Sequence, residues 1–319
     1  MDQPAFSGFE PTLYNYKNEY GIIKVVDNGY GLYNSEIEYL SNGTVIMVDN
    51  GYGLYNSEIE YISNGTVISN SFNNALPFEP NNSTSKCGFS IPKVSYYNGF
   101  YYLIYAEYDC EYEYVLSLAK TTNPLDVKSW NFLGHVLTNI PIDIATILWA
   151  TPENELANHY FFYAQYGTKI NIAVSKDPLN WQILNKTILK PRDDHFDNIV
   201  FPGAMPLRLK TDDFLFIYGG RSDRFYTGWA ILDANDPTNV VQRCENPLMT
   251  PTSWEGVESS ITTLLPDPYG CPLDVANIIG TEYAYNAECF FGFYISDAGV
   301  GAVRVVSSWN NAHISTPNV

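Results

Sequence analysis

Four times along the chain, a stretch rich in aromatic residues is followed by a stretch of small and branched residues. The unit recurs every ~50 to 75 residues and shows no helical periodicity, which is typical of proteins built from radially repeated sheets. The four pairs are Phe100–Tyr105 with Val115–Ala119, Tyr160–Ala164 with Ile170–Val174, Phe214–Tyr218 with Thr227–Ile231, and Phe290–Tyr294 with Gly301–Val305. The sequence therefore predicts an all-β propeller.

The even spacing of these repeats predicts one domain over all 319 residues rather than two domains of average size. Blades are expected at residues 88–133, 143–184, 195–243 and 254–306, and the region before them is expected to supply another. We therefore predict a single five-bladed β-propeller over residues 1–319.

A tandem duplication lies at residues 26–68. Residues 26–46 recur at 48–68 with one change, Leu40 to Ile62, and a shift of 22 residues. Each copy alternates polar and apolar residues and then turns at Ser-Asn-Gly, which predicts a β-hairpin.

Two arrangements of the duplicated hairpins are open. Both hairpins join one sheet, or one copy does the ancestral job and the other is an appended hairpin. We favour the second, because a duplicated segment seldom finds a place to pair already prepared for it. The appended hairpin would carry an unused strand edge, through which the chain could associate with itself.

The charge balance narrows the range of partners. The chain has 17 Lys and Arg against 35 Asp and Glu, a formal net charge of −18. Such a field repels phosphate backbones and anionic lipid, so we expect neither nucleic acid nor membrane as a partner. We also expect no cofactor and no metal, since no ligand constellation stands out.

The N-terminal residues lack the basic and apolar regions of a signal peptide, and no stretch reaches the ~18 apolar residues of a membrane span. As written, we expect a soluble cytoplasmic chain, with secretion after processing left open. The five cysteines are scattered and form no CxxC pair, which favours reduced thiols over disulfides or zinc.

Three segments resemble the fourth blade of glycoside hydrolase family 130, namely Phe214–Gly220, Tyr226–Arg243 and Asn246–Pro251. Cys289–Val305 is similar to the last blade of that family. The resemblance covers roughly residues 86–306. It implies a five-bladed fold and an oligosaccharide substrate, since the family contains mannoside phosphorylases and related hydrolases.

The resemblance also implies that the phosphorolytic site is substituted. In the phosphorylases, an early Glu-Asp-Pro-Arg stretch carries the acid, and the acid and arginine positions align with Ile91 and Lys93. The phosphate-contacting lysine aligns near Asn198, and the histidine of a Tyr-His-Gly motif aligns with Gly219. Isoleucine cannot transfer a proton, and Asn and Gly carry no charge that would hold phosphate.

Polar residues just before the innermost strands of a propeller converge near its axis. Inverting glycoside hydrolysis needs two carboxyl groups ~6.5–9.5 Å apart, and the sequence offers several such pairs. The predicted catalytic residues are Asp197, Glu258 and Asp143, with Asp27 or Asp49 as further candidates, and the predicted sugar-contacting residues are Trp149, His195, Tyr226 and Trp254. Each also has a structural interpretation, as a turn cap, a solvated loop charge or a core aromatic.

Two functions follow from these residues. The first is a phosphate-independent inverting hydrolase of β-mannoside-like or other oligosaccharides. The second is a propeller that has lost catalysis and serves as a glycan-binding, structural or assembly protein. The substituted positions favour the second function, and the remaining carboxyl groups favour the first.

Overall fold

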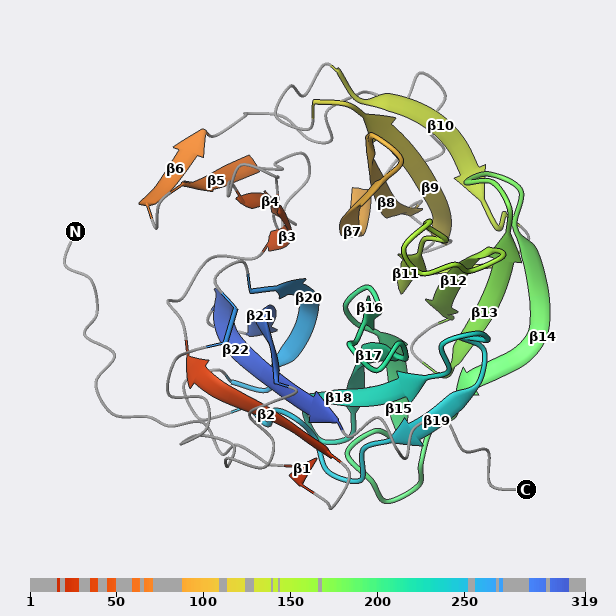
Figure 1. The fold of residues 1–319 in the computed structure, drawn as a ribbon. Helices are drawn as coiled ribbons and strands as arrows, with labels where there is room; N and C mark the ends of the chain where they lie inside the picture. The colour runs from red at the N-terminus through yellow and green to blue at the C-terminus, as the bar shows by residue number, and fades with distance from the viewer. Residues whose placement is uncertain are drawn as a thin grey trace.

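A computed structural model of the chain describes residues 16–17, 21–28, 35–39, 45–49, 59–63, 66–70, 88–108, 114–123, 129–138, 140–142, 144–165, 168–251, 256–267, 270–271, 287–296 and 299–309. The strands in these ranges fall into five antiparallel sheets around a common centre (Figure 1). Within the same ranges, no helix is long and apolar enough to cross a membrane.

Three of the sheets have four strands each, and in two of them, described first, the strand order follows the chain from the centre to the rim (Figure 1). The first contains β7 (Gly88–Tyr97), β8 (Phe100–Tyr108), β9 (Tyr114–Thr121) and β10 (Asn131–Val136). The second contains β11 (Ile144–Leu148), β12 (His159–Ala164), β13 (Ile170–Ser175) and β14 (Gln182–Leu189). This repeated meander is the blade unit of a propeller.

A third sheet continues the series, and a fourth joins the two ends of the chain. The third contains β15 (Ile199–Pro202), β17 (Phe214–Arg221), β18 (Phe225–Leu232) and β19 (Val240–Arg243), with β16 (Leu207–Arg208) also paired to β17. The fourth has the order β20 (Ser260–Pro266), β21 (Glu288–Ser296), β22 (Gly299–Trp309), β2 (Gly21–Asn28) and β1 (Tyr16–Lys17). An N-terminal strand therefore completes the C-terminal sheet.

The repeats seen in the sequence are the neighbouring central strands of these four sheets. Phe162 pairs with Ile172 in one sheet, and Ile217 pairs with Trp229 in another. Strand β12 is buried along its whole length, because adjacent sheets cover both of its faces. The chain is thus an all-β propeller in a single domain, as the sequence predicts.

Packing between the sheets forms the core. One apolar cluster joins the second, third and fourth sheets, and in it the rings of Phe162 and Phe216 lie 4.9 Å apart. Another cluster joins the first and second sheets through residues such as Ile104 and Phe161. Burial of one such side chain contributes ~1.5–3 kcal/mol, so contacts between sheets are a major part of the folding free energy.

The two copies of the duplicated segment share one sheet, so the favoured arrangement with an appended hairpin is wrong. This sheet has the order β3 (Ser35–Tyr39), β4 (Val45–Asp49), β5 (Ile59–Ser63) and β6 (Thr66–Asn70). Strand β4 spans the junction of the copies and pairs with both β3 and β5. Without an appended hairpin, self-association would have to use an edge of this shared sheet, and it stays a prediction.

The prediction of reduced thiols is wrong for two of the cysteines. Cys271 and Cys289 form a disulfide with their Cα atoms 5.1 Å apart. Cys289 is the second residue of β21, and Cys271 lies 18 residues before it in the chain. No local sequence motif indicates that these two cysteines pair. Cys244 is a buried free thiol.

Deleting residues 26–47 tests the shared sheet. The deletion leaves one copy of the hairpin, so the β3–β6 sheet loses two of its strands and exposes an unpaired strand edge. We expect the melting temperature to fall by roughly 5 °C or more and the product to self-associate. Thermal unfolding and size-exclusion chromatography measure both, and a monomer that melts like the full chain would restore the appended-hairpin arrangement.

Candidate functional site

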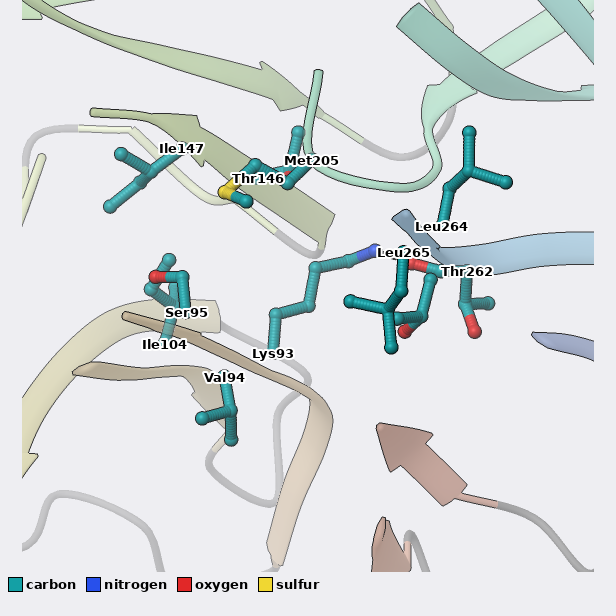
Figure 2. Close-up of a pocket in the computed structure, with 11 residues that line it drawn as sticks. Lys93, Val94, Ser95, Ile104, Thr146, Ile147, Met205, Thr262, Leu264 and Leu265 are labelled. Atoms are coloured by element: carbon teal, nitrogen blue, oxygen red, sulfur yellow. Dashed lines mark hydrogen bonds between the residues drawn. The ribbon is translucent and has the colours of Figure 1, made fainter. Parts of the chain in front are cut away.

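A small cavity lies between the inner strands near the centre of the propeller. Strands β7, β11 and β20 line an axial cavity of ≈ 20 Å³ together with Met205. Figure 2 shows Lys93 extending from β7 into the space between Met205 and Thr262. A cavity of this size holds about one water molecule, so it is too small for a sugar ring.

Lys93 joins three sheets at this centre. Its side chain is buried, and its Nζ donates hydrogen bonds to the carbonyl oxygens of Gly203, at 2.5 Å, and Thr262, at 3.2 Å. A Cβ atom at position 203 would lie 2.8 Å from the carbonyl oxygens of Ile217 and Ile261. Only glycine therefore lets the backbone at position 203 lie this close to β17 and β20. A buried ammonium needs such acceptors to offset its lost hydration.

A much larger opening lies at one end of the third sheet, and we refer to it as the β17–β18 cleft. It is a shallow depression of ≈ 490 Å³ that is largely open to solvent. The loop between β14 and β15, the turn between β17 and β18 and the segment after β19 surround it. Its lining residues are Asp194, His195, Phe196, Asn198, Ser222, Asp223, Tyr226, Pro247 and Thr250.

A glycine allows the loop before β15 to lie against β17. A Cβ atom at Gly220 would stand 2.8 Å from Cβ of Asp197 and 3.0 Å from the ring of Phe196. Within the loop, Asp194 has a φ of 60°, a left-handed conformation that Asp tolerates better than most residues. The loop can therefore turn its polar residues toward the cleft.

Tyr226 and Asp223 form a hydrogen-bonded pair on the cleft wall. The hydroxyl of Tyr226 donates to Oδ1 of Asp223 at 2.7 Å, and the hydroxyl of Ser222 donates to the same oxygen at 3.0 Å. These two bonds hold the pKa of Asp223 below its ordinary value. Burial, together with the Asp223 carboxylate, raises the pKa of Tyr226, so the pair is a carboxylate and a neutral phenol at neutral pH.

Asp197 faces away from the cleft into a charged network. Its side chain is fully buried, and it forms ion pairs with Arg192 at 2.9 Å and Arg243 at 2.5 Å. Burial opposes its charge, but the hydrogen bonds from Arg192 and Tyr218 and the charge of Arg243 outweigh that effect and lower the pKa of Asp197. Asp197 is thus an inaccessible carboxylate, and a catalytic role in proton transfer to a substrate does not fit its position.

Of the other predicted carboxyl groups, Glu258 is the one whose side chain the structure describes. Glu258 is half-buried, and its backbone forms a bridge with Phe225, one residue before Tyr226. It is close in the chain to Ser259, whose amide donates to the Phe225 carbonyl, but it is not among the cleft-lining residues described. Asp143 lies outside the described residues.

The predicted sugar-contacting residues separate into two groups. His195 and Tyr226 both line the cleft, although 31 positions separate them in the chain. Trp149 is buried, stacks on Tyr97 with ring centroids 4.9 Å apart and donates from Nε1 to Ser95. A core side chain of this kind offers no face to a sugar, so its predicted role is wrong.

The predicted sugar-contacting residue Trp254 lies outside the described residues. Among the residues that the structure describes, no group of three or more His, Cys, Asp or Glu is arranged to hold a metal ion.

Sequence reasoning missed Asp223 and the axial position of Lys93. The spacing of Asp223 and Tyr226 across a tight turn between two strands could have indicated that their side chains meet. For Lys93, the alternation within β7 does not reveal which face of the strand reaches the axis. That assignment needs the neighbouring sheets.

The sequence profile of a family described as beta-1,4-mannooligosaccharide phosphorylase matches residues 7–266. The chain belongs to glycoside hydrolase family 130. A match of this length covers most of the propeller, including the cleft and the axial strands.

Within family 130 and its structural neighbours, similarity is modest. A 1,2-beta-oligomannan phosphorylase of Thermoanaerobacter sp. (strain X514) is 28% identical over 173 residues, which cover 53% of this chain and 55% of that protein. The match therefore spans about half the length of this curated relative.

Two solved structures are similar in fold. A glycosyl hydrolase from Bacteroides ovatus has a TM-score of 0.65 and 18% identity, over 86% of this chain and 84% of that one. The beta-1,2-mannobiose phosphorylase of Listeria innocua, solved with beta-1,2-mannobiose, has a TM-score of 0.65 and 14% identity, over 92% and 96%. At such identities these structures support the propeller fold alone.

Replacing Lys93 with Met tests the axial contacts. The change keeps the side-chain volume but leaves the carbonyl oxygens of Gly203 and Thr262 without this donor, so we expect a loss of about 1–3 kcal/mol in unfolding free energy. Denaturant unfolding measures it. Lys186→Met is the control, because that lysine bonds Thr238 and Asn239 at a partly exposed site and should cost less.

Replacing Tyr226 with Phe tests the cleft-wall pair. The change removes the first cause of the lowered Asp223 pKa, so that pKa should rise toward its ordinary value of 3.8. A carboxyl-carbon NMR titration reads the shift directly. Ser222→Ala should raise the pKa of Asp223 by a smaller amount. If neither substitution changes the pKa of Asp223, the two hydrogen bonds to its carboxylate are contradicted.

Proposed function

We propose that this family 130 chain binds oligosaccharides in the β17–β18 cleft and has lost the phosphorolytic chemistry of its relatives. The observation that carries the proposal is the contrast between two sites. The axial cavity, at ≈ 20 Å³ with Lys93 across it, has no room for a sugar. The cleft, at ≈ 490 Å³, has room for one or more.

The chemistry of the cleft suits a sugar. The aromatic ring of Tyr226 can pack on the apolar face of a pyranose. The carboxylates of Asp194 and Asp223 can accept hydrogen bonds from sugar hydroxyl groups, and the amide of Asn198 can both donate and accept. A mostly polar wall that also carries the rings of Phe196 and Tyr226 discriminates sugars by their hydroxyl pattern.

The same wall is poorly suited to phosphate. The cleft-lining residues described include two carboxylates and no lysine or arginine. The phosphate-contacting lysine of the phosphorylases aligns near Asn198, which carries no charge. At Gly219, aligned with their histidine, a Cβ atom would stand 1.9 Å from the ring of Phe201, so Phe201 fills the space that a side chain there would need.

The aligned acid and arginine positions support the loss of catalysis at the axis. Ile91 has no proton to give, and Lys93, in the arginine position, uses its ammonium to bond backbone carbonyl groups. A lysine engaged in this way is a structural cation rather than a ligand for a substrate.

A phosphate-independent inverting hydrolase is the second candidate. The observation that favours it is the presence of two carboxyl groups, Asp194 and Asp223, on the wall of one cleft. Inverting hydrolysis requires one group that donates a proton and one that activates water. Asp194 would replace the buried Asp197 in this scheme, while Asp143 and Glu258 keep their predicted roles as further carboxyl groups.

We also propose that the β3–β6 sheet completes the ring as a fifth blade. Its strand order follows the chain like that of the β7–β10 and β11–β14 sheets, and β3 contacts both β7 and β20. The duplicated segment would then supply a whole blade.

A panel of β-1,4- and β-1,2-mannooligosaccharides, with and without phosphate, tests the function. We expect ligand-induced melting shifts and no phosphate-dependent cleavage, with Tyr226→Ala weakening binding about tenfold through loss of the aromatic platform. Calorimetry gives the affinities, and product analysis gives the cleavage.

Tyr96→Ala is the matched control, because Tyr96 is an exposed tyrosine on β7 away from the cleft. Cleavage without phosphate would establish the hydrolase instead. Phosphorolysis would refute the proposed loss of chemistry, and the absence of any binding would refute the glycan site.

A further inference from the structure

One loop supplies much of the β17–β18 cleft, and a buried charge holds that loop. The loop between β14 and β15 provides Asp194, His195, Phe196 and Asn198 to the cleft wall. Asp197 lies among these residues but is fully buried on the other side of the loop. The residues that line the cleft and the residue that anchors them therefore lie next to one another in one short segment.

Three side chains converge on the Asp197 carboxylate. Arg192 donates from Nε to Oδ1 at 3.0 Å and from Nη2 to Oδ2 at 2.9 Å, which is a bidentate pair. Arg243 donates from Nη2 to Oδ2 at 2.5 Å, and the Tyr218 hydroxyl donates to Oδ2 at 2.7 Å. Each of these donors comes from a different part of the sheet or loop.

The arginines extend the network to the surrounding backbone. Arg192 also donates to the carbonyl of Cys244 at 2.8 Å, and Arg243 donates to the carbonyl of Lys190 at 2.7 Å. The backbone closes the same loop, since the amide of Arg192 donates to the carbonyl of Asp197 at 3.1 Å. One carboxylate thus fixes both ends of the loop to β17 and to the end of β19.

Two further features show that the loop conformation needs support. Arg192 lies over the ring of Phe196, 5.6 Å from its centroid, so the network also orients this cleft residue. Asp194 has a φ of 60°, a conformation that costs less for Asp than for most residues but is still less common than negative φ, so contacts that fix the loop favour it.

The structure assigns Asp197 the role of a positioning residue, whose buried carboxylate holds the Arg192–Asn198 loop in the conformation that places His195 and Asn198 on the cleft wall. Its effect on ligand affinity rests on the proposed function, whereas its effect on the loop does not. Asp197 touches no ligand in this role.

Asp197→Asn tests the role, because it keeps the side-chain size and removes the charge that two arginines share. The melting temperature should fall by roughly 5–10 °C, as expected when one partner of a buried ion pair is removed. In protein with ¹³C-labelled histidine, the His195 ring resonance should shift or broaden, since the loop that carries it is released. The chain has only four histidines, and His195→Gln assigns the signal.

Asp267→Asn is the matched control. Asp267 is also buried and pairs with Arg304 at 3.1 Å in another sheet. This variant should lower the melting temperature while leaving the His195 resonance unchanged. Arg192→Lys keeps the charge, loses the bidentate bond and should shift the His195 resonance in the same direction by less, which provides a milder variant if Asp197→Asn does not fold.

Oligosaccharide affinity is the second measurement. We expect a loss of at least tenfold in Asp197→Asn and none in Asp267→Asn, both measured below the melting temperature. A folded Asp197→Asn protein with a native His195 resonance would overturn the inference. If no glycan binds even the unmodified chain, the proposed function fails, and the His195 resonance alone decides whether Asp197 positions the loop.

Discussion

The pairing of β2 with β22 is the constraint on which the rest of the propeller depends. Each sheet buries its faces against its neighbours, so an open series would leave two apolar faces exposed to water. The N-terminal strand pairs with the C-terminal strand from Gly21 opposite Trp309 to Asn28 opposite Val303. The entropy cost of joining distant segments grows only slowly with the length of chain between them, so the hydrogen bonds and packing of one extended ladder can offset it.

Ring closure brings the innermost strands together, and their side chains then compete for little space. Here Lys93 lies among apolar residues and threonines around a cavity of ≈ 20 Å³, and Gly203 permits a close backbone approach to Ile217 and Ile261. Room for a ligand is found instead at the end of the third sheet, where a loop lies on β17 because Gly220 has no side chain. The molecule therefore buries one charge at the axis among carbonyl groups, and another beneath the cleft between two arginines.

The sequence predicted the central strands well because their signal is local. Aromatic and branched residues crowd into strands that are covered on both faces, and Phe214–Tyr218 and Thr227–Ile231 lie in adjacent strands as expected. The site was harder to predict. His195 and Tyr226 line one opening, and their contact with sugar stays a prediction, whereas Asp197 and the loop acids around it look alike in the sequence. Only their opposite orientations, one toward two arginines and the others toward the cleft, distinguish them.

The duplicated segment shows where the sequence stops being informative. Its two copies are nearly identical, and the sequence alone determined that each forms strands and a hairpin turn, because alternation and turn residues act over a few positions. Yet Asp27 pairs with Arg304 of β22 in the last sheet, whereas the identical Asp49 pairs with Ser35 of β3. The tertiary structure decided the strand partners, the disulfide and the ion pairs of Asp197 that hold the cleft loop. Each of these depends on contacts between residues far apart in the chain.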